Sequence, residues 1–301
     1  PAGKKHTIML YPLWGNPVDE SSDPDKGRFD SYMNEFRDKI IITEPADADA
    51  FVLPFEFSYD ADCISQVNTM EKSAAGHGKK LLVFYNNDDD SEITLNNSIL
   101  LRTSFYKSKQ KHYEFALPGW SRDFASGEKI VFNPKPEKPS VSYYGYVDYL
   151  KTSELFHPKR IYSKLKGKTV TDPSPVLRGK AIRKLLKNKK IRTDFIIRNG
   201  FWAGDMDKFQ ARKEYINNMN SSDYALVIRG AGNFSYRLNE VLSCGKIPLF
   251  VNTDCVLPFD HIVDWKKHMV FTDIKDINRI DTALLDFHSA ISVDDFAEMK
   301  I

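Results

Sequence analysis

Two arginines and one glutamate in the carboxyl-terminal half have the types and spacing to bind a nucleotide diphosphate. Arg229 ends an apolar run, and Arg237 and Glu240 follow three residues apart in a predicted helix. A cation in the first turn opposes the helix macrodipole, so Arg237 has no local electrostatic reason to lie there, and a bound diphosphate would supply one. A carboxylate on the same face could accept both hydroxyls of a ribose. An exposed Arg237–Glu240 ion pair beside a glycine turn accounts for the same residues equally well.

A strand–loop–helix–strand unit must position these side chains. Residues 225–228 and 247–251 form short apolar runs, typical of strands that are covered on both faces of a parallel sheet. Gly232 helps to stop the first run, and Asn233 or Ser235 can cap the helix that follows. The N-terminus of such a helix points free backbone N–H groups into the crevice at the carboxyl ends of the strands, where anions bind.

Five short motifs in this region resemble, in their order and spacing, the carboxyl-terminal half of the exostosin family, glycosyltransferase family 47. The motifs are Arg229-Gly230, Ser235-x-Arg237-x-x-Glu240, Gly245-x-Ile247-Pro248, Leu257-Pro258-Phe259 and Asp264-Trp265. The family usually has Pro before the Arg-Gly pair and Cys after the later glycine, where this chain has Ile228 and Lys246. The resemblance implies an α/β fold of the GT-B type, with two Rossmann-like domains facing across a cleft. It covers the second half strongly and the first half loosely.

The resemblance also implies a reaction, namely inverting transfer of a sugar from a uridine diphosphate (UDP) sugar to a hydroxyl of a glycan acceptor. No divalent metal or other cofactor is expected, because arginines and backbone N–H groups would meet the diphosphate. Glu240 would hold the ribose, and a glycine at 145 would let the backbone approach the donor. Among the donors that exostosin relatives use, we favour a xylosyl or glucuronosyl group. The expected donor-binding residues are Gly145, Arg178, Arg229, Gly232, Asn233, Ser235, Arg237 and Glu240.

Acidic residues of the first half offer a catalytic base and a rival metal site. Residues 46–60 resemble the exostosin motif in which an Ala-Asp pair precedes an apolar strand. Glu56 follows that strand, where a general base could meet an acceptor hydroxyl, although an acid at such a place is more often a helix cap or solvated. Asp88 and Asp90 form a D-x-D pattern, which holds Mn²⁺ in metal-dependent transferases of another fold. Three acidic residues after a strand usually form a solvated turn. A metal-dependent transferase that uses Asp88 and Asp90 is the alternative to the metal-independent enzyme.

Length, prolines and charge indicate two domains. A chain of 301 residues can bury two cores, and the proline-rich stretch 133–140 predicts a boundary between domains 1–138 and 139–301. A C-terminal helix expected at 294–300 often crosses back to the first domain in such enzymes. Up to Pro139 there are 17 basic and 22 acidic residues, against 26 and 19 in the remainder. A basic second half suits an anionic ligand.

Partners other than a nucleotide sugar and a glycan are not expected. The basic helix predicted from Arg178 to Arg192 leaves a non-catalytic polyanion-binding or glycan-binding module as a further alternative. A pI near 8.4 is low for a nucleic-acid-binding domain. No apolar run approaches the 18 or so residues of a membrane span.

A cytoplasmic location is expected. Three cysteines without metal-ligand or C-x-x-C spacing favour a reducing compartment. A glycosylation sequon at Asn233 would place a glycan inside the proposed donor loop. A lumenal domain trimmed of its anchor is the alternative.

Overall fold

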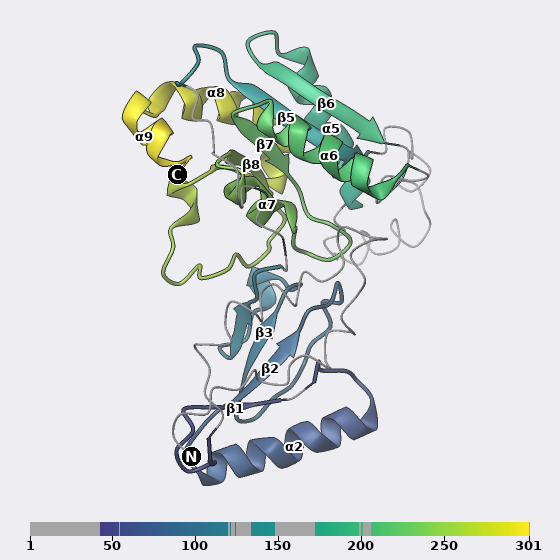
Figure 1. Ribbon diagram of the computed structural model, residues 1–301, viewed down its shortest axis with the longest axis vertical. Helices are drawn as coiled ribbons and strands as arrows, with labels where there is room; N and C mark the ends of the chain where they lie inside the picture. The colour runs from purple at the N-terminus through teal and green to yellow at the C-terminus, as the bar shows by residue number, and fades with distance from the viewer. Residues whose placement is uncertain are drawn as a thin grey trace. The chain divides into compact units, whose positions relative to one another are not determined.

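The chain forms two compact units, which are described separately. The computed structural model describes residues 43–53, 55–119, 121, 124, 134–147, 172–198, 200 and 206–300. As far as their residues are described, unit 1 comprises Pro1–Arg122, Gly232–Tyr236 and Asp254–Val263, and unit 2 comprises Asp123–Ala231, Arg237–Thr253 and Asp264–Ile301 (Figure 1). The proline-rich stretch predicts a single boundary at 138/139. The structure instead divides the chain at 122/123 and returns two short segments to unit 1.

Unit 1 contains a parallel sheet of four strands among the described residues, in the order β1-β2-β3-β4. The strands are β1 (Phe51–Val52), β2 (Leu81–Tyr85), β3 (Ser98–Arg102) and β4 (Glu114–Ala116), and the 3₁₀ helix η2 (Lys107–Lys109) precedes β4. Helix α2 (Ala61–Gly76) joins β1 to β2, and its N-cap Asp60 accepts a hydrogen bond from the N–H of Cys63 at 2.8 Å. Alternate residues of β2 are buried, so one side of this strand builds the core of the unit.

In the part of unit 2 that the structure describes, five parallel strands form a sheet in the order β6-β5-β7-β8-β9. Its strands are β5 (Ser140–Tyr146), β6 (Arg192–Arg198), β7 (Tyr224–Val227), β8 (Ile247–Asn252) and β9 (Val270–Asp273). In chain order the arrangement is 2-1-3-4-5, which is one of the two common doubly wound orders. The strand order reverses between β5 and β7, so the crevice that such sheets use for ligands lies at the carboxyl ends of these two strands.

Helices cover both faces of the sheet in unit 2. Their bounds are α5 (Ser174–Lys187), α6 (Lys208–Asn220), α7 (Arg237–Ser243), α8 (Ile280–Ala290) and α9 (Val293–Glu298), with 3₁₀ helices η4 (Trp265–Lys267) and η5 (Ile274–Arg279). Helices α5 and α8 contact each other, whereas α6 packs on β5 and α7 on β7 and β8 (Figure 1). Every residue of β7 is buried. The continuous apolar run of this strand is therefore explained by cover on both sides.

Two expected strands are confirmed, and two expected helix starts need correction. Strands at 225–228 and 247–251 are present. Helix α7 starts only at Arg237, so neither Asn233 nor Ser235 caps it. Helix α5 begins at Ser174, which puts Arg178 in the second turn and not at the helix start. The sequence also predicts a strand at residues 6–13 and a helix at residues 29–40, and both ranges lie outside the described residues.

The C-terminal helices pack within unit 2. Phe296 of α9 is fully buried in the same apolar cluster as β7 and α5. Lys300 is 1 % exposed and forms an ion pair with Asp223 at 3.1 Å. The stretch expected to be a linker also joins this unit, because the carbonyl of Pro136 lies 2.8 Å from Nε2 of His288 in α8. The last helix is therefore part of unit 2, and its return to the first domain stays a prediction.

Candidate functional site

Arginine and tyrosine side chains gather at the carboxyl ends of β5 and β7 in unit 2. Tyrosines form three of the last four residues of β5, and Arg229 lies two residues beyond the end of β7. This is the point where the strand order reverses. We call the group formed by Tyr143, Arg178, Tyr215, Arg229 and Arg237 the arginine–tyrosine cluster.

Arg237 is held by the end of β5 and by α6. Its Nη2 donates to the carbonyl of Tyr144, and its Nε donates to the hydroxyl of Tyr215 at 3.3 Å. The guanidinium also lies 4.6 Å from the ring centroid of Tyr143. Gly145 has φ +148°, and a Cβ there would lie 3.3 Å from Nη2 of Arg237 and 3.2 Å from the Tyr143 hydroxyl. Glycine at 145 thus leaves room for the arginine, a more specific role than approach to the donor.

Arg178 and Arg229 approach the same point. Nη2 of Arg178 donates to the carbonyl of Arg229 at 2.9 Å, and Nη1 donates to the carbonyl of Tyr146 at 3.4 Å. Nη2 of Arg229 donates to the carbonyl of Asp172 at 3.2 Å. Burial lowers the pKa of Arg178, and the positive charges of Arg237 and Arg229 lower it further, against the effect of Tyr143. Three guanidinium groups therefore concentrate positive charge at this edge of the sheet.

Glu240 lies beside the cluster and is connected to Arg237 through Tyr215. The glutamate is 6 % exposed, and its Oε2 accepts a hydrogen bond from the Tyr215 hydroxyl at 2.5 Å. Its Oε1 lies 3.7 Å from Nη1 of Arg212. Burial raises the pKa of Tyr215, and the negative charge of Glu240 raises it further. The phenol therefore stays protonated and donates to the carboxylate. Because Glu240 is buried, its surroundings differ from the exposed ion pair with Arg237 that the spacing alone allowed.

Gly232, Asn233 and Ser235 belong to unit 1 and not to this cluster. The backbone N–H of Asn233 donates to Oγ of Ser104 at 2.8 Å, and its side-chain amide donates to the carbonyl of Phe105 at 3.0 Å. Ser235 is half-buried and lies two residues before α7. The N–H group of Asn233 is thus used within unit 1 in this structure, and the donor-binding role expected of this loop stays a prediction. Spacing could not reveal this, because Ser104 lies 129 residues away in the chain.

Glu56 lies in unit 1, four residues beyond the end of β1. The half-buried carboxylate accepts a hydrogen bond from the backbone N–H of Asn86 at 3.0 Å. Burial raises the pKa of Glu56 to about 7, although the hydrogen bond acts to lower it. A carboxyl group with a pKa near neutrality can take up a proton in solution at neutral pH, as a general base must.

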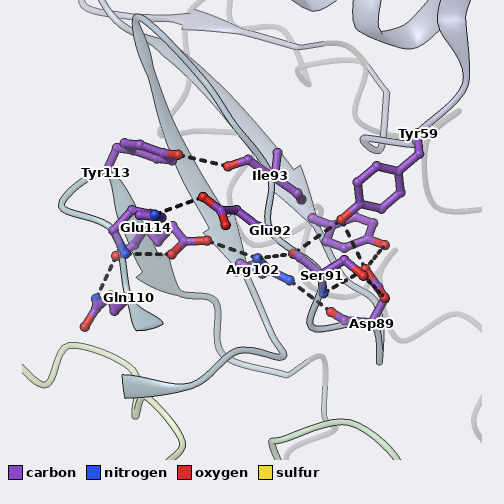
Figure 2. Close-up of polar contacts among 11 residues, drawn as sticks. Tyr59, Asp89, Ser91, Glu92, Ile93, Arg102, Gln110, Tyr113 and Glu114 are labelled. Atoms are coloured by element: carbon purple, nitrogen blue, oxygen red, sulfur yellow. Dashed lines mark hydrogen bonds and ion pairs between the residues drawn. The ribbon is translucent and has the colours of Figure 1, made fainter. Parts of the chain in front are cut away.

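The acidic turn after β2 is partly committed to structure. Oδ2 of Asp89 accepts hydrogen bonds from the hydroxyls of Tyr59 at 3.1 Å and Tyr85 at 3.2 Å (Figure 2). Asp88 and Asp90, the two carboxylates of the D-x-D pattern, are exposed. In the described parts of the chain, no group of three or more His, Cys, Asp or Glu residues is placed to hold a metal ion.

Sequence reasoning missed the tyrosines and two further arginines around the cluster. The guanidinium of Arg198 lies 4.8 Å from the Tyr144 ring centroid, and that of Arg212 lies 5.8 Å from the Tyr215 ring centroid. One signal was available, since Tyr143, Tyr144 and Tyr146 cluster around Gly145, which is one of the expected donor-binding residues. Arg212 and Tyr215 lie three residues apart on α6 and so share one face of the helix. This spacing is common in helices and does not single the two residues out.

A comparison with protein families finds a match in the same region. Residues 161–286 match the model of the exostosin GT47 domain. The match includes Arg178, Tyr215, Arg229, Arg237 and Glu240, and it confirms the resemblance that the sequence motifs carry.

Similar curated proteins match over short stretches. A "probable glucuronosyltransferase" of Oryza sativa subsp. japonica is 35% identical over 81 residues, covering 27% of this chain and 18% of the relative. A "probable beta-1,4-xylosyltransferase" of Arabidopsis thaliana is 36% identical over 70 residues, covering 23% and 17%. Exostosin-1 of Drosophila melanogaster is 36% identical over 62 residues, covering 21% and 8%. The aligned stretch is thus less than a fifth of each relative's length.

Among the described residues, no helix combines the length and the apolar character that crossing a bilayer requires.

Proposed function

We propose that this chain is a glycosyltransferase that moves a sugar from a UDP-sugar to a hydroxyl of a glycan acceptor, with inversion. The observation that carries the proposal is the arginine–tyrosine cluster at the point where the strand order of unit 2 reverses. Three arginines at such a crevice suit a diphosphate, and the matched family and the names of the relatives support a sugar as the group transferred.

In the proposed reaction, the cluster stabilises the leaving group. The acceptor oxygen forms a bond to the anomeric carbon while the bond from that carbon to the diphosphate oxygen breaks on the opposite face. UDP leaves with the bonding electron pair, and Arg178, Arg229 and Arg237 neutralise its growing charge without the need for a divalent metal. Glu240 accepts hydrogen bonds from the ribose hydroxyls. Glu56 takes the acceptor proton, which requires the two units to act as the two halves of a GT-B enzyme.

For the donor we favour xylosyl or glucuronosyl groups, as the relatives' names suggest. Calorimetric titration with UDP, UDP-xylose, UDP-glucuronic acid, UDP-glucose and UDP-galactose tests the assignment. Saturable UDP binding that Arg237→Ala weakens at least tenfold is expected. An Arg237→Ala variant that is folded and binds UDP as tightly as the parent would remove the cluster from the donor site.

A cytoplasmic location is part of the proposal. Each of the three cysteines, all within the described residues, is a thiol and not part of a disulfide. Asn233 is 2 % exposed, so a glycan on its sequon is incompatible with the folded unit 1. Treatment of the natively produced protein with an N-glycosidase should leave its mass unchanged, whereas a loss of mass would favour a lumenal enzyme.

A further inference from the structure

Tyr59 is an exposed aromatic residue that is fixed on several sides. The residue is 46 % exposed. Its ring meets Phe57 edge to face at a centroid distance of 5.3 Å and Tyr85 at 6.1 Å. Its hydroxyl donates to Oδ2 of Asp89 at 3.1 Å. An exposed ring of this kind has little conformational freedom to lose when a ligand packs against it.

The loop that anchors Tyr59 is itself held rigidly. Arg102 is 1 % exposed, and its Nη1 and Nη2 donate to the carbonyls of Ser91 and Asp89, each at 3.0 Å (Figure 2). A buried ion pair of 3.0 Å with Glu114 orients this guanidinium. The loop from Asn86 to Ser91 is therefore tied to the end of β3 and the start of β4, and it forms a preorganised support.

The same loop holds the proposed base. Glu56 accepts the N–H of Asn86 at the beginning of the loop, and Tyr59 binds Asp89 near its end. The carboxylate and the aromatic ring are thus anchored to one short support, three residues apart in the chain. Pyranose rings pack their C–H faces on aromatic side chains, which concentrate negative charge on the ring face. Binding sites commonly combine such a surface with a few fixed polar groups.

The charges around Tyr59 select against an anionic ligand. Asp60, Asp62, Asp88 and Asp90 are exposed near Tyr59 in the chain or in its anchoring loop. Arg102 is paired with Glu114 and buried, so it adds little positive charge at the surface. A uronate or sulfated sugar would meet like charges here, whereas a neutral sugar would not.

From this arrangement we infer that Tyr59 is the platform for a neutral pyranose ring of the acceptor, and that the loop from Asn86 to Ser91 anchors Tyr59 and Glu56 together. The inference rests on the proposed function and adds the class of acceptor and the residue that positions it.

The test is binding of oligosaccharides to the full chain. Neutral tetrasaccharides of β-1,4-linked xylose, glucose, mannose and N-acetylglucosamine, and anionic tetragalacturonic acid, are titrated and followed by saturation-transfer NMR. We expect saturable binding of at least one neutral probe and at least tenfold weaker binding of the anionic probe. Tyr59→Ala should weaken binding of the neutral probe at least tenfold. Tyr59→Trp, which keeps an aromatic face, should bind the probe with an affinity within threefold of the parent's.

Phe209→Ala supplies a matched control, because Phe209 is 47 % exposed and lies in unit 2. This variant should bind the neutral probe like the parent, and circular dichroism should show all variants folded. No binding of any neutral probe, preference for the anionic probe, or unchanged binding by folded Tyr59→Ala would each overturn the inference. UDP binding, measured on the same samples by calorimetry, fails only if the proposed donor site is wrong, so the two failures are distinguishable.

Discussion

Glu56 is buried enough to disfavour its charge and yet receives only one backbone hydrogen bond. A carboxyl whose pKa is raised on folding lowers stability as pH rises from about 4.5 through about 7, because the folded state resists losing the proton. Glu56→Gln removes that cost. We expect the free energy of unfolding of the variant to exceed that of the parent by roughly 1–2 kcal/mol at pH 8, after discounting for solvent screening. At pH 4 the two proteins should be nearly equal in stability.

Chemical denaturation of both proteins at pH 4, 6 and 8 measures this difference. If the difference in the free energy of unfolding between the two proteins is the same at all three pH values, Glu56 keeps an ordinary pKa in the folded protein.

The same carboxyl should control the pH dependence of turnover. A general base acts in its ionised form, so kcat/KM should rise with pH and level off above about 7. Glu56→Gln should lower turnover by about 10² to 10⁴ and leave UDP affinity intact. Initial rates from pH 5 to 9 together with calorimetry check both statements. Activity within a few-fold of the parent would move the role to another acid or to a mechanism without a protein base.

Glu240 and Tyr215 should contribute to donor affinity in different ways. Glu240→Gln keeps the size but removes the charge that strengthens hydrogen bonds to a ribose, so UDP affinity should fall by about 1 to 3 kcal/mol. Tyr215→Phe keeps the ring and removes the hydroxyl between Glu240 and Arg237, so a smaller loss of about 1 kcal/mol is expected. Calorimetry with UDP measures both. Unchanged affinity in Glu240→Gln would remove the ribose role.

At the scale of elements, the end of β5 determines where Arg237 lies. Gly145→Ala would force a Cβ into a left-handed φ of +148° and against the guanidinium. We expect a loss of about 1–3 kcal/mol in stability from the backbone and weaker UDP binding from the displaced arginine. Gly76→Ala is the control, because nothing lies within 4 Å of a Cβ there. Thermal melting and calorimetry of the two variants should separate them, and equal behaviour would show that Gly145 is not needed to seat Arg237.

Patterns of neighbouring residues predicted those features of the elements that depend only on nearby residues in the chain. The apolar runs of β7 and β8 and the motif that carries Arg229, Arg237 and Glu240 were visible in the sequence. The start of α7 was not visible in the sequence. Asn233 makes hydrogen bonds to Ser104 and Phe105 and does not cap the helix. Such partners are far apart in the chain, and no spacing rule relates them.

The surroundings of the cluster were hidden for a similar reason. Tyr215 reaches Glu240 and Arg237 from a different helix, so its role depends on how α6 and α7 pack against the sheet. Propensity and periodicity describe single elements. The three predicted arginines do come together in the structure, and their binding role stays a prediction.

For the whole molecule, the proposed chemistry predicts independence from metal. If Arg178, Arg229 and Arg237 compensate the diphosphate, turnover in excess EDTA should match turnover in Mg²⁺ within about twofold. Asp88→Asn combined with Asp90→Asn should be tolerated, whereas Arg237→Ala should lose most activity. Rates with and without EDTA are the measurement. Inactivation by EDTA that Mn²⁺ restores would favour the metal-dependent alternative, because the carboxylates alone would repel the diphosphate.

The two short segments that return to unit 1 have a consequence for how the protein is made. Asn233 donates to Ser104, and the N–H of Lys107 donates to the carbonyl of Asp254 at 2.7 Å. During synthesis, the ribosome releases Ser104 and Lys107 long before these partners emerge. The first unit must therefore wait, incompletely packed, until the nascent chain has grown past residue 263. Premature termination anywhere before that point should leave it a substrate for chaperones and proteases.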